Sequence, residues 1–349
     1  MKIALITDTH FGARGDSSAF DLSFKRFYSE VFFPTLIDRN IKQIIHLGDC
    51  FDRRKYINFN SLKTCREYFF DKAKELGIKI DMLVGNHDTF FKNTNEVNSP
   101  DLLLNDYENI TTISNPLVRE YGDLKILMLP WICNDNYDKV MEYVNAKEAS
   151  VCFGHLELNG FQMWKGQESF EGHDPKIFKD YRLVYSGHFH HKHGKDNIHY
   201  LGNPYQMFWN DYEDERGFHI FDTEKLESEF IINPFKMFEK LYYDDVKELP
   251  DVNSFKDKMI KVVVVNKTNI YDYDRYIDNL YKANPIEVRI IEDYSEFEGE
   301  AVGDESLDVS DTLTLLEQYV DAIDTDADKN RLKTLMKTLY VEAQDFATE

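Results

Sequence analysis

Seven residues with oxygen or nitrogen donors follow apolar runs in the first 190 positions of the chain. They are Asp8, His10, Asp49, Asn86, His155, His188 and His190. Each lies at or just past the end of a run typical of a β-strand, and an α/β sheet presents its ligands at the carboxyl ends of its strands. Carboxylates, imidazoles and one amide oxygen gathered at one edge suit two divalent cations about 3.5–4 Å apart. The sequence therefore predicts a two-metal site.

The spacing within each motif supports this prediction. Asp8 and His10 are two positions apart, as are His188 and His190, and in an extended backbone such side chains point the same way. A carboxylate such as that of Asp49 can bridge two cations with its two oxygens. Each motif alone also fits a turn or a buried histidine. Five of them in this order favour one metal site.

The elements that must position these residues alternate along the first part of the chain. Strands are expected at 2–7, 43–47 and 78–84, separated by helices at 18–39 and 60–76. This order favours parallel strands with helices on the faces of the sheet. Later strands fit a second sheet, and they are expected at 124–129, 150–153, 183–185, 198–201, 218–221 and 229–232. A layered α/β sandwich fits this pattern better than a barrel.

Three further segments are expected after Pro234. A small β-α-β module fills 235–292, with strands at 259–265 and 286–291 around a helix at 271–282. An acidic linker follows at 293–311, and two amphipathic helices are expected within 312–349. Their apolar stripes include Leu313, Leu316, Val320, Leu335 and Leu339. The first segment, 1–234, would then hold the whole metal site.

The composition bounds the class of protein. No apolar stretch is long enough to span a membrane, and the four cysteines form no Cys-x-x-Cys pair, which favours a reduced, cytoplasmic protein. The net charge of −22 argues against a general nucleic-acid binder. The acidic linker inflates that total, however, and basic residues follow the metal motifs. Arg14, Arg53, Arg54, Lys55 and Lys92 could form a rim that attracts phosphate, or they could be ordinary solvated side chains.

The motifs also carry a resemblance to a known family. On Asp8-x-His10, Gly48-Asp49, Gly85-Asn86-His87-Asp88, Gly154-His155 and Gly187-His188-x-His190, residues 1–232 resemble the calcineurin-like metallophosphoesterases. Within that superfamily the chain is similar to the SbcD and Mre-eleven type DNA repair nucleases, above all to phage recombination endonuclease subunits. The block Gly48-Asp49-Cys50-Phe51-Asp52, the small module and the terminal helix pair carry this narrower likeness.

The resemblance implies a fold and a set of ligands. The fold would be a four-layer sandwich of two sheets flanked by helices. Asp8, His10, Asp49 and His190 would hold one ion, and Asp49, Asn86, His155 and His188 the second. The family implies two Mn²⁺, with Mg²⁺ possible. His87, assigned to neither ion, is the candidate general acid, and we expect Asp88 to fix its tautomer. The chain departs from archaeal and eukaryotic members at Asp52, where they have histidine.

The resemblance also implies partners. The substrate would be DNA, cleaved by exonuclease or endonuclease action during recombination and double-strand-break repair. The small module would cap the DNA, and the helix pair would dock on an SbcC or Rad-fifty type coiled-coil ATPase. The family implies a homodimer within a heterotetramer, and the helix at 60–76, with Tyr68, Phe69 and Phe70, is a candidate dimer surface. No membrane is implied, and the protein would act in the host cytoplasm if a phage encodes it.

Two other functions remain open on the sequence alone. A protein phosphatase or small phosphodiesterase of the same superfamily would use the same ligands, although it does not obviously need the two C-terminal segments. A non-catalytic scaffold would bind partners through the old site. The complete ligand set argues against a scaffold, since a site freed from chemistry can lose ligands.

Overall fold

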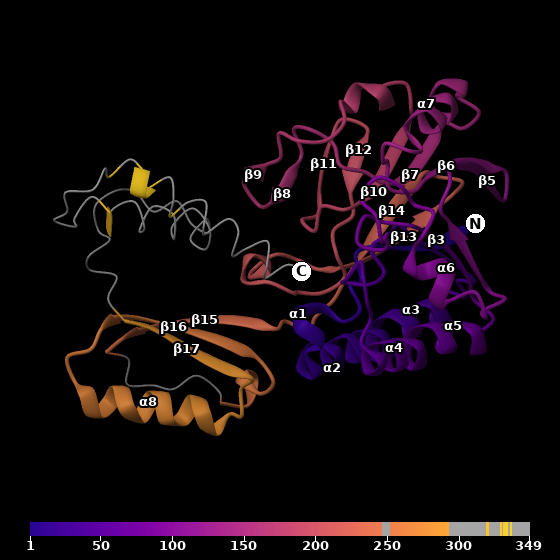
Figure 1. Cartoon of the computed structure of the whole chain (residues 1–349). Helices are drawn as coiled ribbons and strands as arrows, with labels where there is room; N and C mark the ends of the chain where they lie inside the picture. Colours follow the sequence, from indigo (N-terminus) through magenta and orange to yellow (C-terminus); the bar gives the residue numbers. More distant parts are fainter. Residues whose placement is uncertain (246–251, 293–318, 321–328, 330, 334–335, 337–349) are drawn as a thin grey trace. The chain divides into compact units, whose positions relative to one another are not determined.

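The computed structural model describes residues 1–245, 252–292, 319–320, 329, 331–333 and 336 (Figure 1). The chain divides into two compact units, 1–292 and 293–349. The expected linker at 293–311 lies outside the described residues, as do Leu313, Leu316, Leu335 and Leu339. Val320 is described in the second unit and is buried. Among the described helices, none has the length and apolar character needed to cross a membrane.

The first sheet has six strands in the order β14-β13-β1-β2-β3-β4. Four of them run parallel, and they are β1 (Lys2–Ile6), β2 (Gln43–His46), β3 (Lys79–Leu83) and β4 (Ile110–Ile113). The other two complete the sheet through antiparallel pairs, in which β13 (Gly217–Asp222) pairs with β1 and β14 (Glu227–Ile232) pairs with β13. The carboxyl ends of β1, β2 and β3 therefore share one edge.

The second sheet also has six strands, in the order β11-β12-β10-β7-β6-β5. Its parallel strands are β6 (Leu124–Leu129), β7 (Val151–His155), β10 (Leu183–Gly187) and β12 (Ile198–Tyr200). Antiparallel strands close its edges, namely β5 (Leu117–Tyr121) and β11 (His193–Lys195). A separate hairpin is formed by β8 (Gln162–Trp164) and β9 (Gln167–Glu168).

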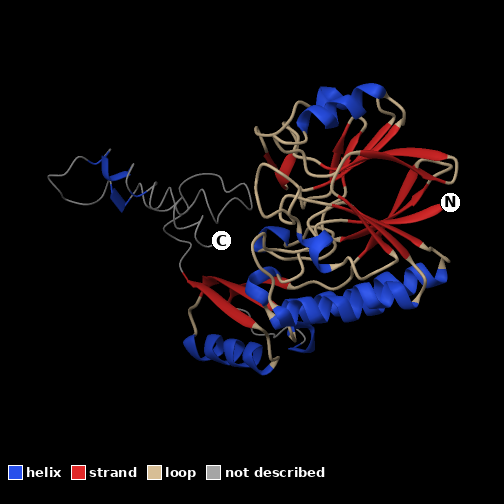
Figure 2. Ribbon diagram, turned by 45° about the vertical axis from the view of Figure 1, so that its right-hand side comes forward, coloured by secondary structure: helices blue, strands red, loops and turns tan. Residues whose placement is uncertain are grey.

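Helices cover the outer faces of the two sheets (Figure 2). On the first sheet, a π-helical turn at Tyr28–Phe32 joins α2 (Ser18–Phe27) to α3 (Phe33–Asp38), and a second at Arg66–Phe70 joins α4 (Phe59–Cys65) to α5 (Asp71–Glu75). The second sheet packs against α7 (Tyr137–Ala146). Shorter helices are α1 (Ala13–Asp16) and α6 (Ser99–Leu103), with 3-10 turns at Pro175–Phe178, Trp209–Asp211 and Val252–Phe255. The four-layer α/β sandwich expected from the sequence is confirmed.

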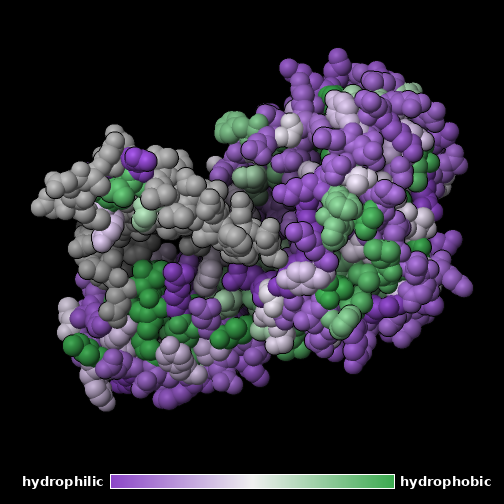
Figure 3. All heavy atoms as spheres, in the orientation of Figure 1, coloured by the Kyte–Doolittle hydropathy of each residue, from purple (hydrophilic) through white to green (hydrophobic). Residues whose placement is uncertain are grey.

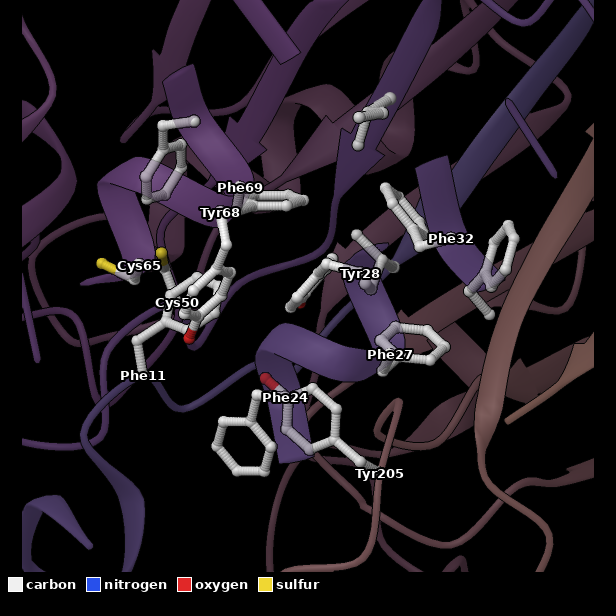
Figure 4. Packing of buried hydrophobic residues seen from close by; sticks show 14 of the residues in the cluster. Phe11, Phe24, Phe27, Tyr28, Phe32, Cys50, Cys65, Tyr68, Phe69 and Tyr205 are labelled. Carbon is white, nitrogen blue, oxygen red and sulfur yellow. The ribbon is translucent and has the colours of Figure 1, made fainter. Parts of the chain in front are cut away.

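Alternation along the strands divides the core into layers. In β1, Ile3 and Leu5 face the second sheet, whereas Ala4 and Ile6 face the helices. Strands buried on both faces are continuous apolar runs, which is why these segments carry no polar alternation. The layer under the helices is largely aromatic, and Figure 4 shows Phe24, Phe27, Tyr28 and Tyr205 among its packed rings. Phe24 stacks on Tyr205 with ring centroids 3.6 Å apart.

The aromatic layer corrects the expected dimer surface. Tyr68, Phe69 and Phe70 are all buried in this core, and the rings of Phe69 and Tyr28 lie 4.8 Å apart. The prediction that they form an exposed contact surface is therefore wrong. They occupy the inner face of the helical segment because the π-helical turn and the adjoining helices wind them against the first sheet.

A three-stranded sheet follows the sandwich. It contains β15 (Phe238–Asp244), β16 (Met259–Asn266) and β17 (Glu287–Glu292), all parallel, with α8 (Ile270–Lys282) on one face. Asn269 caps α8 by accepting hydrogen bonds from the first helical N–H groups. The sequence indicated β16, α8 and β17 but missed β15. Phe238 packs within the aromatic layer of the sandwich, with its ring 6.1 Å from that of Phe20.

Candidate metal centre

The strand ends bring the predicted ligands together at one place. Asp8 follows β1, Asp49 follows β2 and Asn86 follows β3, while His155 ends β7 and His188 follows β10. Within the described part of the chain, two groups of side chains have donor atoms within 4.8 Å of one another. The first is Asp8, His10 and His190, and the second is Asp49, His155 and His188.

The first group surrounds the Nε2 atom of His190. That atom lies 3.1 Å from Nε2 of His10 and 4.0 Å from Oδ1 of Asp8. Nε2 of His10 lies in turn 3.8 Å from Oδ2 of Asp49. Imidazole nitrogens that face each other this closely, beside two carboxylates, leave a position where one cation can contact all of them.

The second group surrounds the same oxygen of Asp49. Nε2 of His155 lies 3.3 Å from Oδ2 of Asp49 and 2.9 Å from Oδ1 of Asn86. Nδ1 of His188 also lies 2.9 Å from Oδ1 of Asn86. Asn86, named from the sequence, thus belongs to this group. Oδ2 of Asp49 is thus within 4 Å of a histidine nitrogen from each group and links the two groups.

Neighbouring groups fix the orientation of these donors. The carbonyl oxygen of Leu47 accepts a hydrogen bond from Nδ1 of His155 at 2.8 Å, which turns Nε2 toward the centre. The His87 N–H donates to Oδ1 of Asp49 at 2.7 Å, leaving Oδ2 for the cations. The Asp8 carboxylate accepts bonds from the hydroxyl of Thr7 and the N–H of His188. Such contacts set ligand orientation and basicity.

The backbone at the centre is strained. Asp8, His10, Asp49 and His188 have φ values of 51°, 41°, 53° and 88°, a region that non-glycine residues seldom adopt and that costs about 1–3 kcal/mol each. Gly48, at φ 102°, is required by close approach, since a Cβ there would lie 2.5 Å from Nδ1 of His155. Four of the predicted ligands therefore share this rare backbone conformation, although other non-glycine residues of the described chain adopt it as well.

Burial sets the charges of the donors. It lowers the pKa of His10 and of His188 to about 3, so both rings are neutral near neutral pH and offer lone pairs. Burial raises the pKa of Asp8 to about 7, and the nearby charge of Asp49 adds to this increase. Burial also opposes charge on His155, but Asp49 outweighs it and raises the pKa of His155 to about 9.

These donors fit divalent cations. In the protein without ions, a proton on His155 balances the buried carboxylate of Asp49, whose pKa burial would raise but His155, His87 and His10 hold well below its usual range. A cation would supply that positive charge instead, and binding would release the proton. Three carboxylate or amide side chains and four imidazoles provide the oxygen and nitrogen donors that Mn²⁺ accepts.

His87 lies beside the first group, with its ring centroid 4.9 Å from that of His10. Its Nδ1 donates to the backbone carbonyl oxygen of Asp52 at 2.7 Å. The prediction that Asp88 fixes the tautomer of His87 is therefore wrong. Asp88 is fully buried and accepts hydrogen bonds from the N–H groups of Cys50, Phe51 and Gly85, so it holds two ligand loops together.

The five basic residues named from the sequence have different surroundings. Lys55 and Lys92 are exposed, and so is Arg14, whose guanidinium lies 5.7 Å from the ring centre of Phe208. Arg53 forms an ion pair with Asp16 at 2.9 Å, which leaves it less free to hold phosphate.

Arg54 differs from the other four. It is half-buried, and its Nη1 atom is buried with no hydrogen-bond partner. Burial lowers its pKa, and the charge of Asp49 opposes that effect. A guanidinium nitrogen without a partner, within electrostatic reach of the metal centre, is suited to a phosphate oxygen, which would reach this covered nitrogen only after the Arg54 side chain moves.

Three residues near the centre escaped the sequence analysis. The ring of Trp131 lies 5.3 Å from that of His188. Oε1 of Glu157 lies 4.0 Å from Nε2 of His188. Arg216 donates to the carbonyl oxygen of His190 and pairs with buried Asp211 at 2.7 Å. Trp131 follows strand β6 and Glu157 follows β7, a placement that could have indicated them, whereas no local pattern marks Arg216.

The centre can be compared with known proteins. A model of the calcineurin-like phosphoesterase family matches residues 1–192. The chain belongs to this family. As a calcineurin-like phosphoesterase it is similar to exonuclease subunit 1 of Enterobacteria phage T4, with 30% identity over 349 residues, 98% of this chain and 99% of that protein.

Two other proteins show more limited similarity. The DNA double-strand break repair protein Mre11 of Sulfurisphaera tokodaii is 29% identical over 199 residues, 54% of this chain and 49% of its own length. Among solved structures, an archaeal phosphodiesterase is 16% identical, with a TM-score of 0.33 over 67% of this chain and 100% of that one.

Proposed function

We propose that this phosphoesterase is the nuclease subunit of a DNA-processing complex and hydrolyses DNA phosphodiesters with two divalent cations. The observation that carries this proposal is the position of Asp49, whose Oδ2 lies 3.8 Å from Nε2 of His10 and 3.3 Å from Nε2 of His155. One shared carboxylate oxygen between two histidine groups suits a two-cation centre. The similarity along nearly the whole chain to a phage exonuclease subunit supports DNA as the substrate.

Each predicted ligand has a proposed role. Asp8, His10 and His190 would hold one ion, Asn86, His155 and His188 the other, and Asp49 both. When bound, the two cations would lower the pKa of a water molecule and neutralise charge on the phosphate. Four imidazole donors favour Mn²⁺ over Mg²⁺, which prefers oxygen ligands, although Mg²⁺ remains an alternative.

The residues around the ligands supply the remaining chemistry. His87 would donate a proton to the departing 3′ oxygen. Because the carbonyl oxygen of Asp52 can only accept, Nδ1 of His87 carries a proton in the neutral ring. The outer nitrogen, Nε2, therefore has a proton to give only in the imidazolium form. Arg54 would bind a non-bridging phosphate oxygen through Nη1, as charge-assisted hydrogen bonds to phosphate are among the strongest in proteins.

One experiment tests the proposed reaction. The purified chain is incubated with linear duplex DNA, single-stranded DNA and a phosphorylated protein while Mn²⁺ or Mg²⁺ is titrated, with a chelator as control. We expect Mn²⁺-dependent cleavage of DNA that Asp49→Asn abolishes, because an amide cannot bridge two cations. Hydrolysis of the phosphoprotein but not of DNA would support a phosphatase instead. No hydrolysis of any substrate, with cations bound, would support a scaffold.

The proposed complex also has partners. The apolar stripes at 312–349 would dock on an SbcC-type coiled-coil ATPase, the helix-in-groove mode of recognition, and the sheet of β15, β16 and β17 would cap the DNA.

For the homodimer we propose the surface of α2 and α4, where Leu22 and Phe59 are 60% and 87% exposed. A charge at this position, in Phe59→Glu, should convert dimers to monomers in analytical ultracentrifugation. An unchanged dimer would exclude this surface.

Figure 3 shows hydrophobic residues in separate patches on a mostly hydrophilic visible face. Such patches, when contiguous, mark interaction sites more often than scattered apolar side chains do.

A further inference from the structure

We infer that the hairpin of β8 and β9 carries a stacking site for a nucleobase beside the metal centre, with Trp164 as its platform. This inference rests on the proposed function, since it assumes a nucleic-acid substrate. Trp164 is half-buried, and its ring centroid lies 6.4 Å from that of His190, a proposed ligand. A base stacked on this ring would belong to a nucleotide next to the phosphate that is cut.

Two other side chains complete the site. The ring of Phe208 lies 6.3 Å from that of Trp164 and is nearly parallel to that of His190, at an interplanar angle of 22°. The guanidinium carbon of Arg14 lies 5.7 Å from the centre of Phe208. Aromatic rings interleaved with cations are the usual surface for unpaired bases, because every base has a π-face and every nucleotide a negative charge.

The hairpin holds Trp164 in place through several hydrogen bonds. The N–H of Gln162 donates to Nε2 of His193 at 2.9 Å, and the N–H of Gly166 donates to the side chain of Gln162 at 3.0 Å. At the base of the hairpin, the backbones of Phe161 and Ser169 are joined at 2.8 Å. A platform fixed in this way costs less entropy when a base stacks on it.

Packing leaves part of the Trp164 side chain open. The tip of the hairpin has only two paired positions, and the residues that follow Trp164, from Lys165 to Glu168, are all exposed. Trp164 itself is only half-buried, whereas Phe161 at the base of the hairpin is fully packed, so part of the Trp164 ring remains open to a base. Lys165, next to Trp164, adds an exposed cation for the phosphate backbone.

The test compares the activity of two proteins on each of two substrates. Wild type and Trp164→Ala are compared on a single-stranded oligonucleotide and on an abasic oligomer of the same length, which keeps the phosphates but has no bases. We expect Trp164→Ala to lower kcat/KM about tenfold on the normal strand, as stacking on one aromatic residue contributes this much or more. On the abasic strand the two proteins should differ by less than about twofold.

Two controls separate stacking from a structural effect. Trp164→Phe keeps an aromatic face and should recover most of the activity. Phe170→Ala removes another aromatic residue of the same region, one that is 81% exposed, and should cleave both strands as the wild type does. The intrinsic fluorescence of the wild type should be quenched more by the normal strand than by the abasic strand, and Trp164→Phe should lose that difference.

The outcomes distinguish this inference from the proposed function. Equal losses on both strands in Trp164→Ala, or no recovery in Trp164→Phe, would overturn the stacking site while leaving the nuclease function intact. A wild-type protein that cleaves neither strand in Mn²⁺ would overturn the nuclease function and the stacking site together.

Discussion

The fold shields the donor side chains at the centre from solvent without a bound ion. His155 and Asp8 are fully buried, and His10 is 3% exposed. Burial of this kind is costly for charged groups unless they are paired. This cost explains why the rings of His10 and His188 are neutral, whereas protonated His155 pairs with the carboxylate of Asp49. These buried donors are therefore suited to bind divalent cations, which would supply the positive charge that the side chains lack.

The first prediction concerns His87. Replacing it in His87→Ala removes the proposed proton donor but none of the metal ligands, so turnover should fall about 10²–10⁴-fold. The stoichiometry of Mn²⁺ binding, measured by calorimetry, should remain two per chain. His173→Ala is a matched control, because His173 is another half-buried histidine and belongs to neither donor group. Wild-type turnover of His87→Ala in saturating Mn²⁺ would exclude this role.

A second prediction follows from the free nitrogen of Arg54. Arg54→Met keeps most of the apolar stem but loses the guanidinium, and kcat/KM on DNA should fall at least about tenfold, as expected for a hydrogen bond to a charged group. The melting temperature should not decrease, since Nη1 of Arg54 has no partner to lose. Lys55→Met, an exposed cation next to it, should reduce kcat/KM by much less. A large drop in melting temperature with unchanged kcat/KM would contradict the phosphate role.

The predicted ligands are positioned in two ways, some by the ends of parallel strands and others by a loop. Parallel strands of the two sheets bring Asp49, Asn86 and His155 together, and buried Asp88 ties the loops of Asp49 and Asn86 to each other. The loop after β10 needs support from elsewhere, and it receives it from Arg216, which is 4% exposed and donates to the carbonyl oxygen of His190 and to the side chain of Asn203. Two carboxylates, those of Asp211 and Asp214, neutralise its charge at 2.7 and 2.9 Å.

The third prediction concerns this buried network. Arg216→Met leaves Asp211 and Asp214 without a cation, which should lower the free energy of unfolding by about 3–5 kcal/mol. Mn²⁺ affinity should fall as well, because the loop of His190 loses its anchor. Arg39→Met is the matched control, since Arg39 pairs with Glu229 at the surface, and such pairs contribute about 1 kcal/mol or less. Chemical denaturation of both variants measures the difference, and equal losses would contradict the argument.

The fourth prediction is a pH dependence in the same network. Burial would raise the pKa of Asp214, but its bond to His191 and the charge of Arg216 hold that pKa below the usual 3.8. A lowered folded pKa contributes stability above pH 4 that is lost as the pH falls through the folded value. Asp214→Asn should therefore be less stable than the wild type at neutral pH, and the difference should shrink below pH 4. A difference that grows in acid would contradict this sign.

For the molecule as a whole, the sequence predicted the features that local patterns of apolar and polar residues determine. The parallel strands and the convergence of donor side chains at their ends were predictable, because apolar runs of the right length are followed by donors at fixed spacing. The roles of Asp88 and of Tyr68 were not, since each depends on which face of a turn or helix is buried, and a π-helical turn changes that face. Arg216 was invisible because its contact with His190 joins loops 26 positions apart.

The last prediction concerns the division of labour between the two units. The donors of the centre all lie in 1–292, whereas the apolar stripes proposed to bind the ATPase lie in 312–349. Deleting 312–349 should therefore abolish co-purification with the ATPase but leave Mn²⁺-dependent cleavage of DNA by the nuclease alone. As a matched variant, Leu313→Asp with Leu316→Asp in the full chain should also lose the ATPase, because charges on an apolar stripe oppose its burial. Undiminished binding in the truncated chain would place the docking surface in the first unit.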